Sequence, residues 1–285
     1  MTSDKKNLPA SVHSRLLNLA RKKRRTFGEL LQFYGLERFL YRLSVSEYKN
    51  QYILKGAMMF LHWTGEQSRP TRDIDLLRYE PISVAELTKV FKIICNVDVK
   101  PDGVNFDSKT VKAERIIPEQ GQSGVRVTFK GYLGKSEIPM QIDVALGYKV
   151  VPKVKKISLA TLLDFPRPVL KGYSPETSLA EKIHAITKLG LLNSRLKDYY
   201  DLWYIMQNVS INQRDLVAAI RKTFQNRNTP IPPILPEGFS DAYAKRHKDA
   251  WLVMLRRNSL EGPDLQQVIN FLAKSIEPVL LKAAE

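Results

Sequence analysis

Two carboxylates with the spacing of a metal site, Asp73 and Asp75, lie in the run Ser68-Arg-Pro-Thr-Arg-Asp-Ile-Asp-Leu-Leu77. The run is predicted to be a strand, so both carboxylates point to one face while Ile74 points to the core. Arg72 falls on the face opposite the carboxylates, and we expect no catalytic role for it. Neighbouring carboxylates repel each other unless a cation neutralises them, and Mg²⁺ is the hard cation that prefers carboxylate oxygen. The spacing therefore predicts a magnesium site at Asp73 and Asp75.

A glycine turn precedes this strand at the end of the apolar run Tyr52-Ile-Leu-Lys-Gly-Ala57. Glycine lets the backbone come close to a phosphate, whose oxygens backbone N–H groups can bind. We therefore expect Lys55, Gly56 and Ala57 to contact a phosphorylated ligand. After the turn, the apolar residues up to about position 62 are expected to be helical.

A third carboxylate, Asp143, lies in a later run of period two. It stands on the face opposite four apolar residues, Ile138, Met140, Ile142 and Val144. A third carboxylate on a neighbouring strand is what a two-metal phosphoryl-transfer site requires. The alternative is an exposed aspartate on the polar face of a half-buried strand. Beside Asp73 and Asp75, we favour the site.

Two charged residues of the C-terminal part are further candidates. Lys182 borders the apolar stripe of a predicted helix, and Asp198 shares one face of the next helix with Asp201. The alternative for Lys182 is a snorkelling lysine that buries its stem and exposes its ammonium. The alternative for Asp198 is an exposed ion pair with Arg195, worth under about 1 kcal/mol.

The elements that must position these residues follow from hydrophobic periodicity. Period-two alternation fills much of the region from about 98 to 150, and a basic, proline-punctuated connector covers 150–172. We predict two domains, residues 1–170 with the strands and residues 171–285 as a helical lobe. Helices are predicted at 11–24, 26–43, 83–95, 175–190, 193–206 and 264–282.

The chain is strongly basic, with a net charge of +16 and a pI near 9.8. Such an excess indicates a polyanionic partner, most often nucleic acid. The densest basic run is Arg21-Lys-Lys-Arg-Arg25, which either grips phosphates or is a solvated helix end that complements the helix dipole. A single cysteine, Cys95, allows no internal disulfide and fits a reducing cytoplasm. We expect Cys95 to be a core residue, and we expect no signal segment and no transmembrane helix.

Four pieces of sequence stand in a characteristic order. They are Leu-Lys-Gly-Ala57, Pro-Thr-Arg-Asp-Ile-Asp-Leu76, Ile-Asp-Val-Ala-Leu-Gly147, and Ala180-Glu-Lys-Ile-His-Ala with Arg195-Leu-Lys-Asp-Tyr-Tyr-Asp-Leu202. Together they resemble the AbiEii/AbiGii-type nucleotidyltransferase toxins of the polymerase-β-like superfamily, over roughly residues 10–235. The resemblance implies an α+β fold with a mixed sheet, flanking helices and a helical C-terminal lobe.

The resemblance also implies roles for individual residues. The metal carboxylates fall on Asp73 and Asp75, and Asp143 takes the third-carboxylate position, where it is also a candidate acceptor for the proton of the attacking hydroxyl. The family's later lysine and aspartate fall on Lys182 and Asp198, which are expected to be catalytic, with Lys182 a nucleotide contact as well. Many members carry serine after the motif glycine, whereas this chain has Ala57 and loses a hydroxyl contact to the triphosphate.

The implied activity is the Mg²⁺-dependent transfer of a nucleoside monophosphate from an NTP to RNA. The expected acceptor is the 3′ end of tRNA, which would block translation, and the expected partner is a cognate antitoxin of a toxin–antitoxin or phage-defence operon. Two alternatives stay open. One is a nucleic-acid-binding protein that keeps the fold but is catalytically silent, and the other is an enzyme that nucleotidylates a protein.

Overall fold

A computed structural model describes residues 7–65, 69–116 and 124–285, and it divides the chain into two compact units. The first comprises Met1–Gly147 and Lys156–Gly172, and the second comprises Tyr148–Lys155 and Tyr173–Glu285. The segment Tyr148–Lys155, which the sequence places in the first domain, therefore groups with the second unit. Residues 1–6, and Ser68 of the predicted strand, lie outside the described residues.

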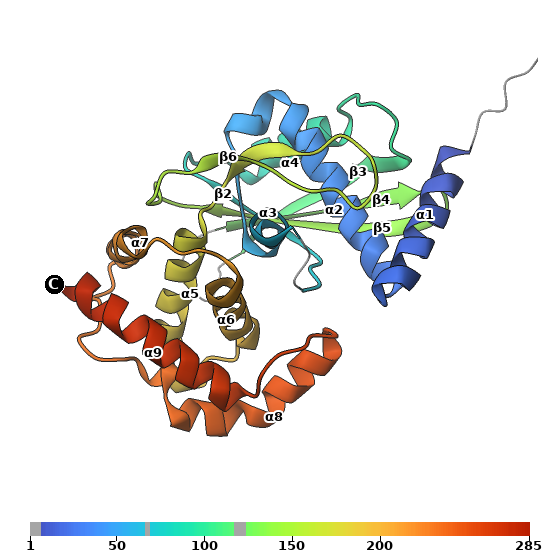
Figure 1. The fold of residues 1–285 in the computed structure, drawn as a ribbon. Helices are drawn as coiled ribbons and strands as arrows, with labels where there is room; N and C mark the ends of the chain where they lie inside the picture. The colour runs from blue at the N-terminus through green and yellow to red at the C-terminus, as the bar shows by residue number, and fades with distance from the viewer. Residues whose placement is uncertain (1–6, 66–68, 117–123) are drawn as a thin grey trace, which may run out of the picture. The chain divides into compact units, whose positions relative to one another are not determined.

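The first unit is built on a mixed sheet, which confirms the predicted α+β class. Within the described residues the sheet has seven strands in the order β3-β4-β5-β2-β1-β7-β6 (Figure 1). Strands β2 and β5 are parallel, whereas β4 is antiparallel to β3 and to β5. The strands are β1 (Ile53–Lys55), β2 (Ile74–Arg78), β3 (Val104–Ile116), β4 (Gly124–Leu133), β5 (Ser136–Leu146), β6 (Lys155–Ser158) and β7 (Val169–Gly172).

Two features of the sheet correct the sequence prediction. The region 150–172 is not only a connector, because it contributes β6 and β7, and β7 pairs in parallel with β1. Each of these two strands has only four residues, so no period could identify them before their partner was known. In addition, β2 begins at Ile74, so Asp73 lies just before the strand and not inside it.

The helices of the first unit lie where the periodicity predicts them. Thr26 caps α2 by accepting a hydrogen bond from the Glu29 N–H at 3.2 Å, and Ser83 with Glu86 forms a capping box at the start of α4. After the glycine turn, a 3₁₀ turn (Gly56–Met59) leads into the short α3. The helices are α1 (Leu8–Lys23), α2 (Phe27–Val45), α3 (Phe60–Thr64) and α4 (Val84–Cys95), with a further 3₁₀ turn at Glu47–Asn50.

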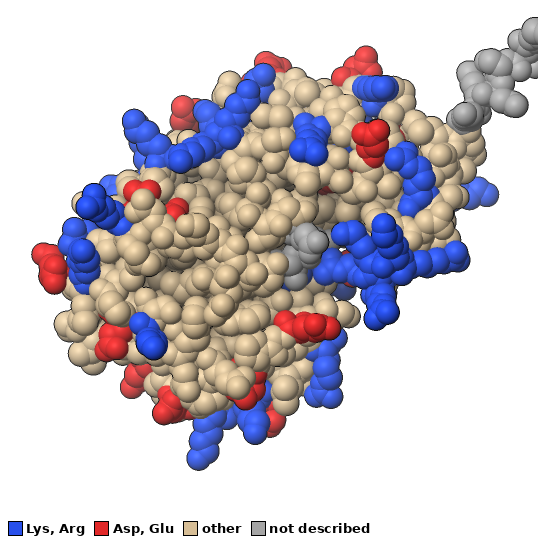
Figure 2. Space-filling model, viewed as in Figure 1, with Lys and Arg blue, Asp and Glu red and all other residues tan. Residues whose placement is uncertain are grey.

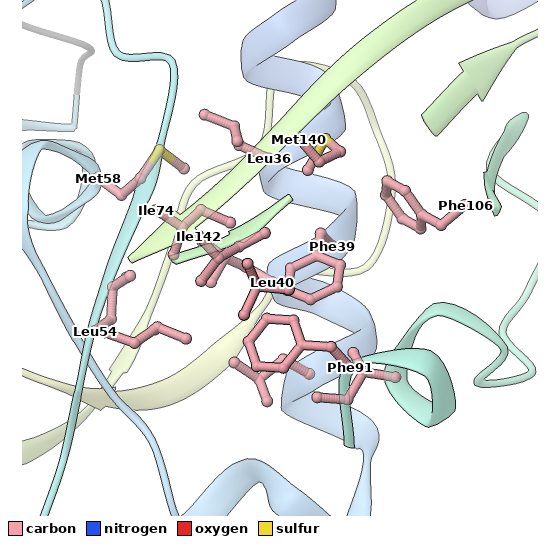
Figure 3. Close-up of a cluster of buried hydrophobic side chains, with 14 of the residues drawn as sticks. Leu36, Phe39, Leu40, Leu54, Met58, Ile74, Phe91, Phe106, Met140 and Ile142 are labelled. Atoms are coloured by element: carbon pink, nitrogen blue, oxygen red, sulfur yellow. The ribbon is translucent and has the colours of Figure 1, made fainter. Parts of the chain in front are cut away.

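The core of the first unit lies between one face of the sheet and helices α2 and α4 (Figure 3). The Phe39 ring of α2 stacks on Phe91 of α4 at 5.6 Å and meets Phe129 of β4 at 5.1 Å. Ile74 and Ile142 point into this core and are fully buried. Because side chains alternate along a strand, the neighbouring residues Asp75 and Asp143 lie on the opposite face.

A buried ion pair ties α2 to the segment between β6 and β7. Glu37 and Arg38 are both fully buried, with Oε1 and Nη2 2.8 Å apart. Glu37 Oε2 accepts a hydrogen bond from the Leu162 N–H at 2.7 Å, and Arg38 Nη2 donates to the Pro166 carbonyl at 3.0 Å. Burial raises the pKa of Glu37 to about 7, against the lowering effect of Arg38. The two charged side chains therefore hold the segment between β6 and β7 against α2, although burying their charges costs desolvation free energy.

The second unit is helical, with a core of stacked aromatic rings. Tyr199 of α6 stacks on Tyr243 of α8 at 4.5 Å, and the Trp251 indole N–H donates to the Pro263 carbonyl at 3.0 Å. The sequence predicted three of these helices closely, but it did not indicate α7. The helices are α5 (Pro175–Leu189), α6 (Leu196–Asn208), α7 (Gln213–Asn226), α8 (Asp241–Arg257) and α9 (Leu265–Ala284), with 3₁₀ turns at Gly190–Leu192 and Glu237–Phe239.

The structure also bears on the predictions for Cys95 and for membrane-spanning helices. Cys95 is buried at the end of α4, and burial raises the pKa of its thiol to about 12. In the described part of the chain, no helix combines the length and the apolar character needed to span a bilayer.

We predict that Arg38→Met lowers the free energy of unfolding by about 3–5 kcal/mol, because it leaves the Glu37 carboxylate buried without its partner. The double variant Glu37→Gln/Arg38→Met removes both charges but keeps an acceptor for the Leu162 N–H, and it should recover most of that loss. Urea unfolding at pH 7 measures both changes. A double variant no more stable than Arg38→Met would contradict this account of the pair.

Candidate functional site

A row of charged residues crosses four neighbouring strands of the first unit. Lys55 of β1 lies opposite Asp75 of β2, and Asp75 lies opposite Asp143 of β5 in parallel register. Asp143 in turn lies opposite Arg126 of β4. Directly opposed residues share one face of a sheet, so the two carboxylates are adjacent and a cation flanks them on each side. This row is the centre of the candidate site.

Gly56 lets the backbone turn tightly against Asp75. Its φ is +70°, a conformation that residues with a Cβ rarely adopt. A Cβ at this position would lie 2.0 Å from Asp75 Oδ2 and 2.8 Å from its Cγ, so no side chain fits without moving the carboxylate. The predicted glycine turn is therefore confirmed, and it packs directly on the Asp75 side chain.

Asp75 is a carboxylate with two other carboxylates nearby. Its pKa is raised to about 6, first by burial and then by Asp73 and Asp143. Lys55 and Arg69 act in the opposite direction. A negative side chain crowded by two others is stabilised when a cation binds among them.

Arg126 is a site residue that the sequence did not single out. Its Nε and Nη2 each donate to one oxygen of Asp143 at 2.8 Å, a bidentate pair with good geometry. In this arrangement both Asp143 oxygens are engaged, which does not favour the predicted role of Asp143 as a proton acceptor. Arg126 alternates with Val125 and Val127 as any polar-face residue would. Only the strand register shows that it faces a candidate metal ligand.

Two further side chains position the chain around Asp73. The Thr71 hydroxyl donates to Asp73 Oδ1 at 2.9 Å, which fixes the orientation of the carboxylate. The Gln32 amide of α2 donates to the Arg72 carbonyl at 3.2 Å and to the Pro139 carbonyl at 2.8 Å. Gln32 therefore links α2 to the entry of β2 and to β5. The Arg72 side chain is exposed.

The donor set of Asp73, Asp75 and Asp143 fits a hard divalent cation by its chemistry, since Mg²⁺ prefers carboxylate oxygen. Among the residues that the structure describes, however, no group of three or more His, Cys, Asp or Glu side chains is arranged to hold a metal ion. Asp73 is turned toward Thr71 and Asp143 toward Arg126. The three-carboxylate metal site therefore stays a prediction.

The second unit contains its own buried charge cluster, centred on Lys182 of α5. The Lys182 ammonium lies 2.7 Å from Asp198 Oδ1 and 2.8 Å from Asp201 Oδ2, both on α6. Arg195 Nε lies 2.7 Å from the other oxygen of Asp198. The side chains of Asp198 and Asp201 are only 6% and 1% exposed.

The contacts of this cluster test the alternatives that the sequence left open for Lys182 and Asp198. The snorkelling alternative for Lys182 is wrong, because the ammonium faces two buried carboxylates. The ion pair between Asp198 and Arg195 is present, but the Asp198 side chain is buried and not exposed. Asp201 belongs to the cluster, although only its shared helix face with Asp198 pointed to it. The catalytic and nucleotide-binding roles assigned to Lys182 and Asp198 stay predictions.

His184, beside the motif lysine, has a structural environment. Its Nε2 lies 3.0 Å from Thr229 Oγ1 and its Nδ1 lies 2.9 Å from Arg227 Nη1. Burial lowers its pKa to about 4, and Arg227 contributes in the same direction. The imidazole is therefore neutral near pH 7 and both nitrogens have partners, which does not suit a general acid or base.

Comparison with known proteins finds one family over most of the chain. The family described as nucleotidyl transferase AbiEii toxin, type IV toxin–antitoxin system, matches residues 38–274. No curated protein matches the chain. The crystal structure of JHP933 from Helicobacter pylori is 15% identical with a TM-score of 0.48, over 87% of this chain and 89% of that one. Another H. pylori structure, of a protein described as a nucleotidyltransferase, is 14% identical with a TM-score of 0.47, over 90% and 96% of the two chains.

We predict that Gly56→Ala destabilises the first unit more than Gly65→Ala does. Both glycines have similar positive φ, +70° and +75°, but an added Cβ at Gly65 meets nothing within 4 Å. Gly65→Ala should cost about 1–2 kcal/mol from backbone strain alone, and Gly56→Ala should cost about 1–3 kcal/mol more because of the clash with Asp75. Urea unfolding tests this, and the excess should shrink in an Asp75→Gly background, which removes the Cβ of residue 75 as well as its carboxylate. An excess that is unchanged there would mean that the clash lies elsewhere.

We also predict that Lys182→Met costs about 3–5 kcal/mol of unfolding free energy, since it leaves buried carboxylates without their cation. Arg195→Gln should cost under about 1 kcal/mol, because Arg195 is more exposed and Asp198 keeps Lys182. Denaturant unfolding of both variants makes the comparison. Equal costs would show that Lys182 is not the cation that holds the cluster together.

Proposed function

The chain belongs to the family of AbiEii nucleotidyltransferase toxins of type IV toxin–antitoxin systems, and on that premise we propose that it transfers a nucleoside monophosphate from an NTP to an RNA acceptor. The proposed acceptor is the 3′ end of tRNA, whose modification would stop translation. The observation that carries the proposal is the placement of Asp75 beside Asp143 with the Gly56 turn packed on Asp75. Carboxylates next to a tight glycine turn are what a site for metal-bound triphosphate requires.

The proposed reaction is a substitution at the α-phosphorus of the NTP. A hydroxyl oxygen of the acceptor forms a new bond to this phosphorus, and the bond from phosphorus to the oxygen that bridges to the β-phosphate breaks. Pyrophosphate leaves with that oxygen, and the hydroxyl proton is lost to water. Such a reaction needs little covalent chemistry from the protein, so catalysis is mainly positioning and charge stabilisation.

The residues of the first unit have separate parts in this proposal. Asp73, Asp75 and Asp143 would hold Mg²⁺, which when bound neutralises the triphosphate and lowers the pKa of the attacking hydroxyl. The backbone around Gly56 would bind phosphate through N–H groups, and Lys55 would add positive charge beside Asp75. At Ala57 only the backbone can contribute, because the residue has no hydroxyl.

Arg126, Lys182 and Asp198 complete the proposed set. Arg126 is proposed to position the Asp143 carboxylate through the bidentate pair. Lys182 is proposed to meet nucleotide phosphate as a compact point charge, and Asp198 to orient its ammonium. An ammonium between two carboxylates has a fixed position, which suits a residue that must meet one phosphate group.

The proposed partners follow from charge and from the family. A net charge of +16 supports an RNA acceptor bound through its phosphates, with an affinity that falls as salt rises. A toxin of this family implies a cognate antitoxin. Phage defence is proposed as the setting in which the system acts.

We predict that Asp75→Asn lowers nucleotide transfer by at least about 10²-fold, the scale for removing one preorganised electrostatic stabiliser. The fold should persist, because the change removes charge but little volume. The control Asp164→Asn alters an exposed aspartate of the same unit and should keep full activity. The assay incubates each protein with Mg²⁺, total tRNA and each α-labelled NTP in turn, and circular dichroism checks the fold.

The same assay separates the proposed function from its rivals. Label in RNA from one NTP, lost in Asp75→Asn, supports the proposal and identifies the base. Label in a protein band would favour a protein acceptor. No label with any NTP, together with binding to RNA that does not depend on Mg²⁺, would favour a catalytically silent nucleic-acid-binding protein.

A further inference from the structure

We propose that the exposed C-terminal end of α1 is the surface that binds the phosphate backbone of the nucleic-acid acceptor. This surface, here called the α1 basic end, consists of Arg21, Lys22, Lys23 and Arg24. All four residues are exposed. The inference rests on the proposed function for the identity of the acceptor, but its binding test does not require that transfer occurs.

The α1 basic end is a dense gathering of positive charge on the face shown in Figure 2. Lysine and arginine side chains crowd together over the point where α1 ends and α2 begins. Arg25, the fifth residue of the basic run, differs from the other four because its side chain is only 17% exposed and its Nη1 lies 3.0 Å from Glu29 Oε1. The surface available to a partner is therefore made by four cations.

Arg24 has a backbone conformation that favours glycine. Its φ is +52°, a left-handed conformation, and its N–H caps α1 through the Ala20 and Arg21 carbonyls. Glycine or asparagine usually takes this position because a Cβ is disfavoured there. Asn228 and Ser259 have similar φ values, so the conformation alone does not mark a functional residue; at Arg24 it places a fourth cation at the end of α1.

The helix dipole does not account for so many cations. The C-terminus of a helix carries a partial charge equivalent to about half an electron, and its effect is confined to the last turn. One basic residue would complement it. Four adjacent exposed cations also repel one another, so the arrangement gains stability when an anion with several charges binds across them.

The α1 basic end lies close to the carboxylate site along a short, continuous path. Thr26 caps α2 directly after the run, and Gln32 of α2 holds the Arg72 carbonyl at 3.2 Å. Six residues of helix at 1.5 Å each separate Thr26 from Gln32, about 9 Å. Asp73 follows Arg72 in the chain, and the Arg72 side chain is exposed. An acceptor strand bound at the α1 basic end would therefore need to extend only a few nucleotides to reach Asp73 and Asp75.

The composition of this surface fits a nucleic acid better than a protein or a membrane. Among the described residues, the large exposed hydrophobic side chains are Val45, Ile93, Tyr148, Leu192, Ile234, Leu252, Val253 and Leu281. None of them lies on α1 or in the first turns of α2. Protein interfaces have an apolar, aromatic core depleted of lysine, and membrane-surface helices insert apolar side chains. A surface of exposed cations, on a helix that carries no large exposed hydrophobic side chain, suits phosphodiester groups.

The test compares two sets of four substitutions that remove the same charge. The first removes the α1 basic end by Arg21→Gln, Lys22→Gln, Lys23→Gln and Arg24→Gly. The control removes four exposed cations of α8 by Lys245→Gln, Arg246→Gln, Arg256→Gln and Arg257→Gln. Fluorescence anisotropy measures binding to an RNA hairpin with a single-stranded 3′ end between about 50 and 200 mM salt, the range in which phosphate contacts weaken most visibly.

We expect the α1 variant to bind the hairpin at least tenfold more weakly than the wild type. The slope of log affinity against log salt should become less steep by about 2–3, because each lost phosphate contact reduces the magnitude of the slope by about 0.7–0.9. The α8 control should keep most of the affinity and slope. Arg24→Gly alone should weaken binding while leaving the thermal midpoint unchanged or higher, since glycine relieves the left-handed strain. A purely structural Arg24 would leave RNA binding unchanged.

Three results would overturn the proposal. Equal losses in the α1 variant and the α8 control would mean that net charge alone drives binding. Wild-type RNA binding by the α1 variant, with lost binding to polyglutamate or to phosphatidylserine vesicles, would assign the surface to an acidic protein or a membrane. If the α1 variant transfers nucleotide to the hairpin with an unchanged KM, the surface is excluded while the proposed function stands. If the wild type transfers nothing, the binding data still decide the surface.

Discussion

Repulsion between two adjacent carboxylates is the constraint on which this structure depends. Asp75 and Asp143 face each other across parallel strands, and their charges would push those strands apart without compensation. The fold supplies a cation on either side, Lys55 and Arg126, in the same row across the sheet. The apolar core on the other face keeps the strands together, because burial of side chains such as Ile74 outweighs a local electrostatic cost. The charged row is therefore tolerated, although burial still raises the pKa of Asp75.

Both units use buried ion pairs to fix one segment against another. Glu37 and Arg38 hold the segment between β6 and β7 against α2. Lys182 fixes α5 to α6 through Asp198 and Asp201. Burying charges seldom adds net stability compared with apolar packing, so such pairs mainly specify one arrangement over others. In the first unit that arrangement supports β7, the parallel neighbour of the strand that leads into Gly56.

Charge is distributed unevenly over the molecule, and this has a consequence for how a substrate would arrive. The row across the sheet places Asp75 and Asp143 side by side, whereas the chain as a whole carries +16. A basic exterior raises the local concentration of polyanions and speeds their association. A polyanion drawn to that exterior still meets repulsion at the carboxylates unless a divalent cation is present there. In the proposed function, the basic exterior would bind the RNA and productive binding would depend on the metal.

The sequence alone determined the features that depend on local pattern. The spacing of Asp73 and Asp75, the period-two run around Asp143, the Gly56 turn and most helices follow from periodicity, capping and the left-handed conformation that glycine allows. Tertiary structure decided what depends on register and packing. That Arg126 faces Asp143, that Asp201 joins Lys182, and that residues 169–172 form a strand beside β1 cannot be read locally. The physical reason is that the burial of whole strands and helices sets which residues face each other across a sheet or between helices. Residues far apart in the chain share no local sequence pattern that predicts such a contact.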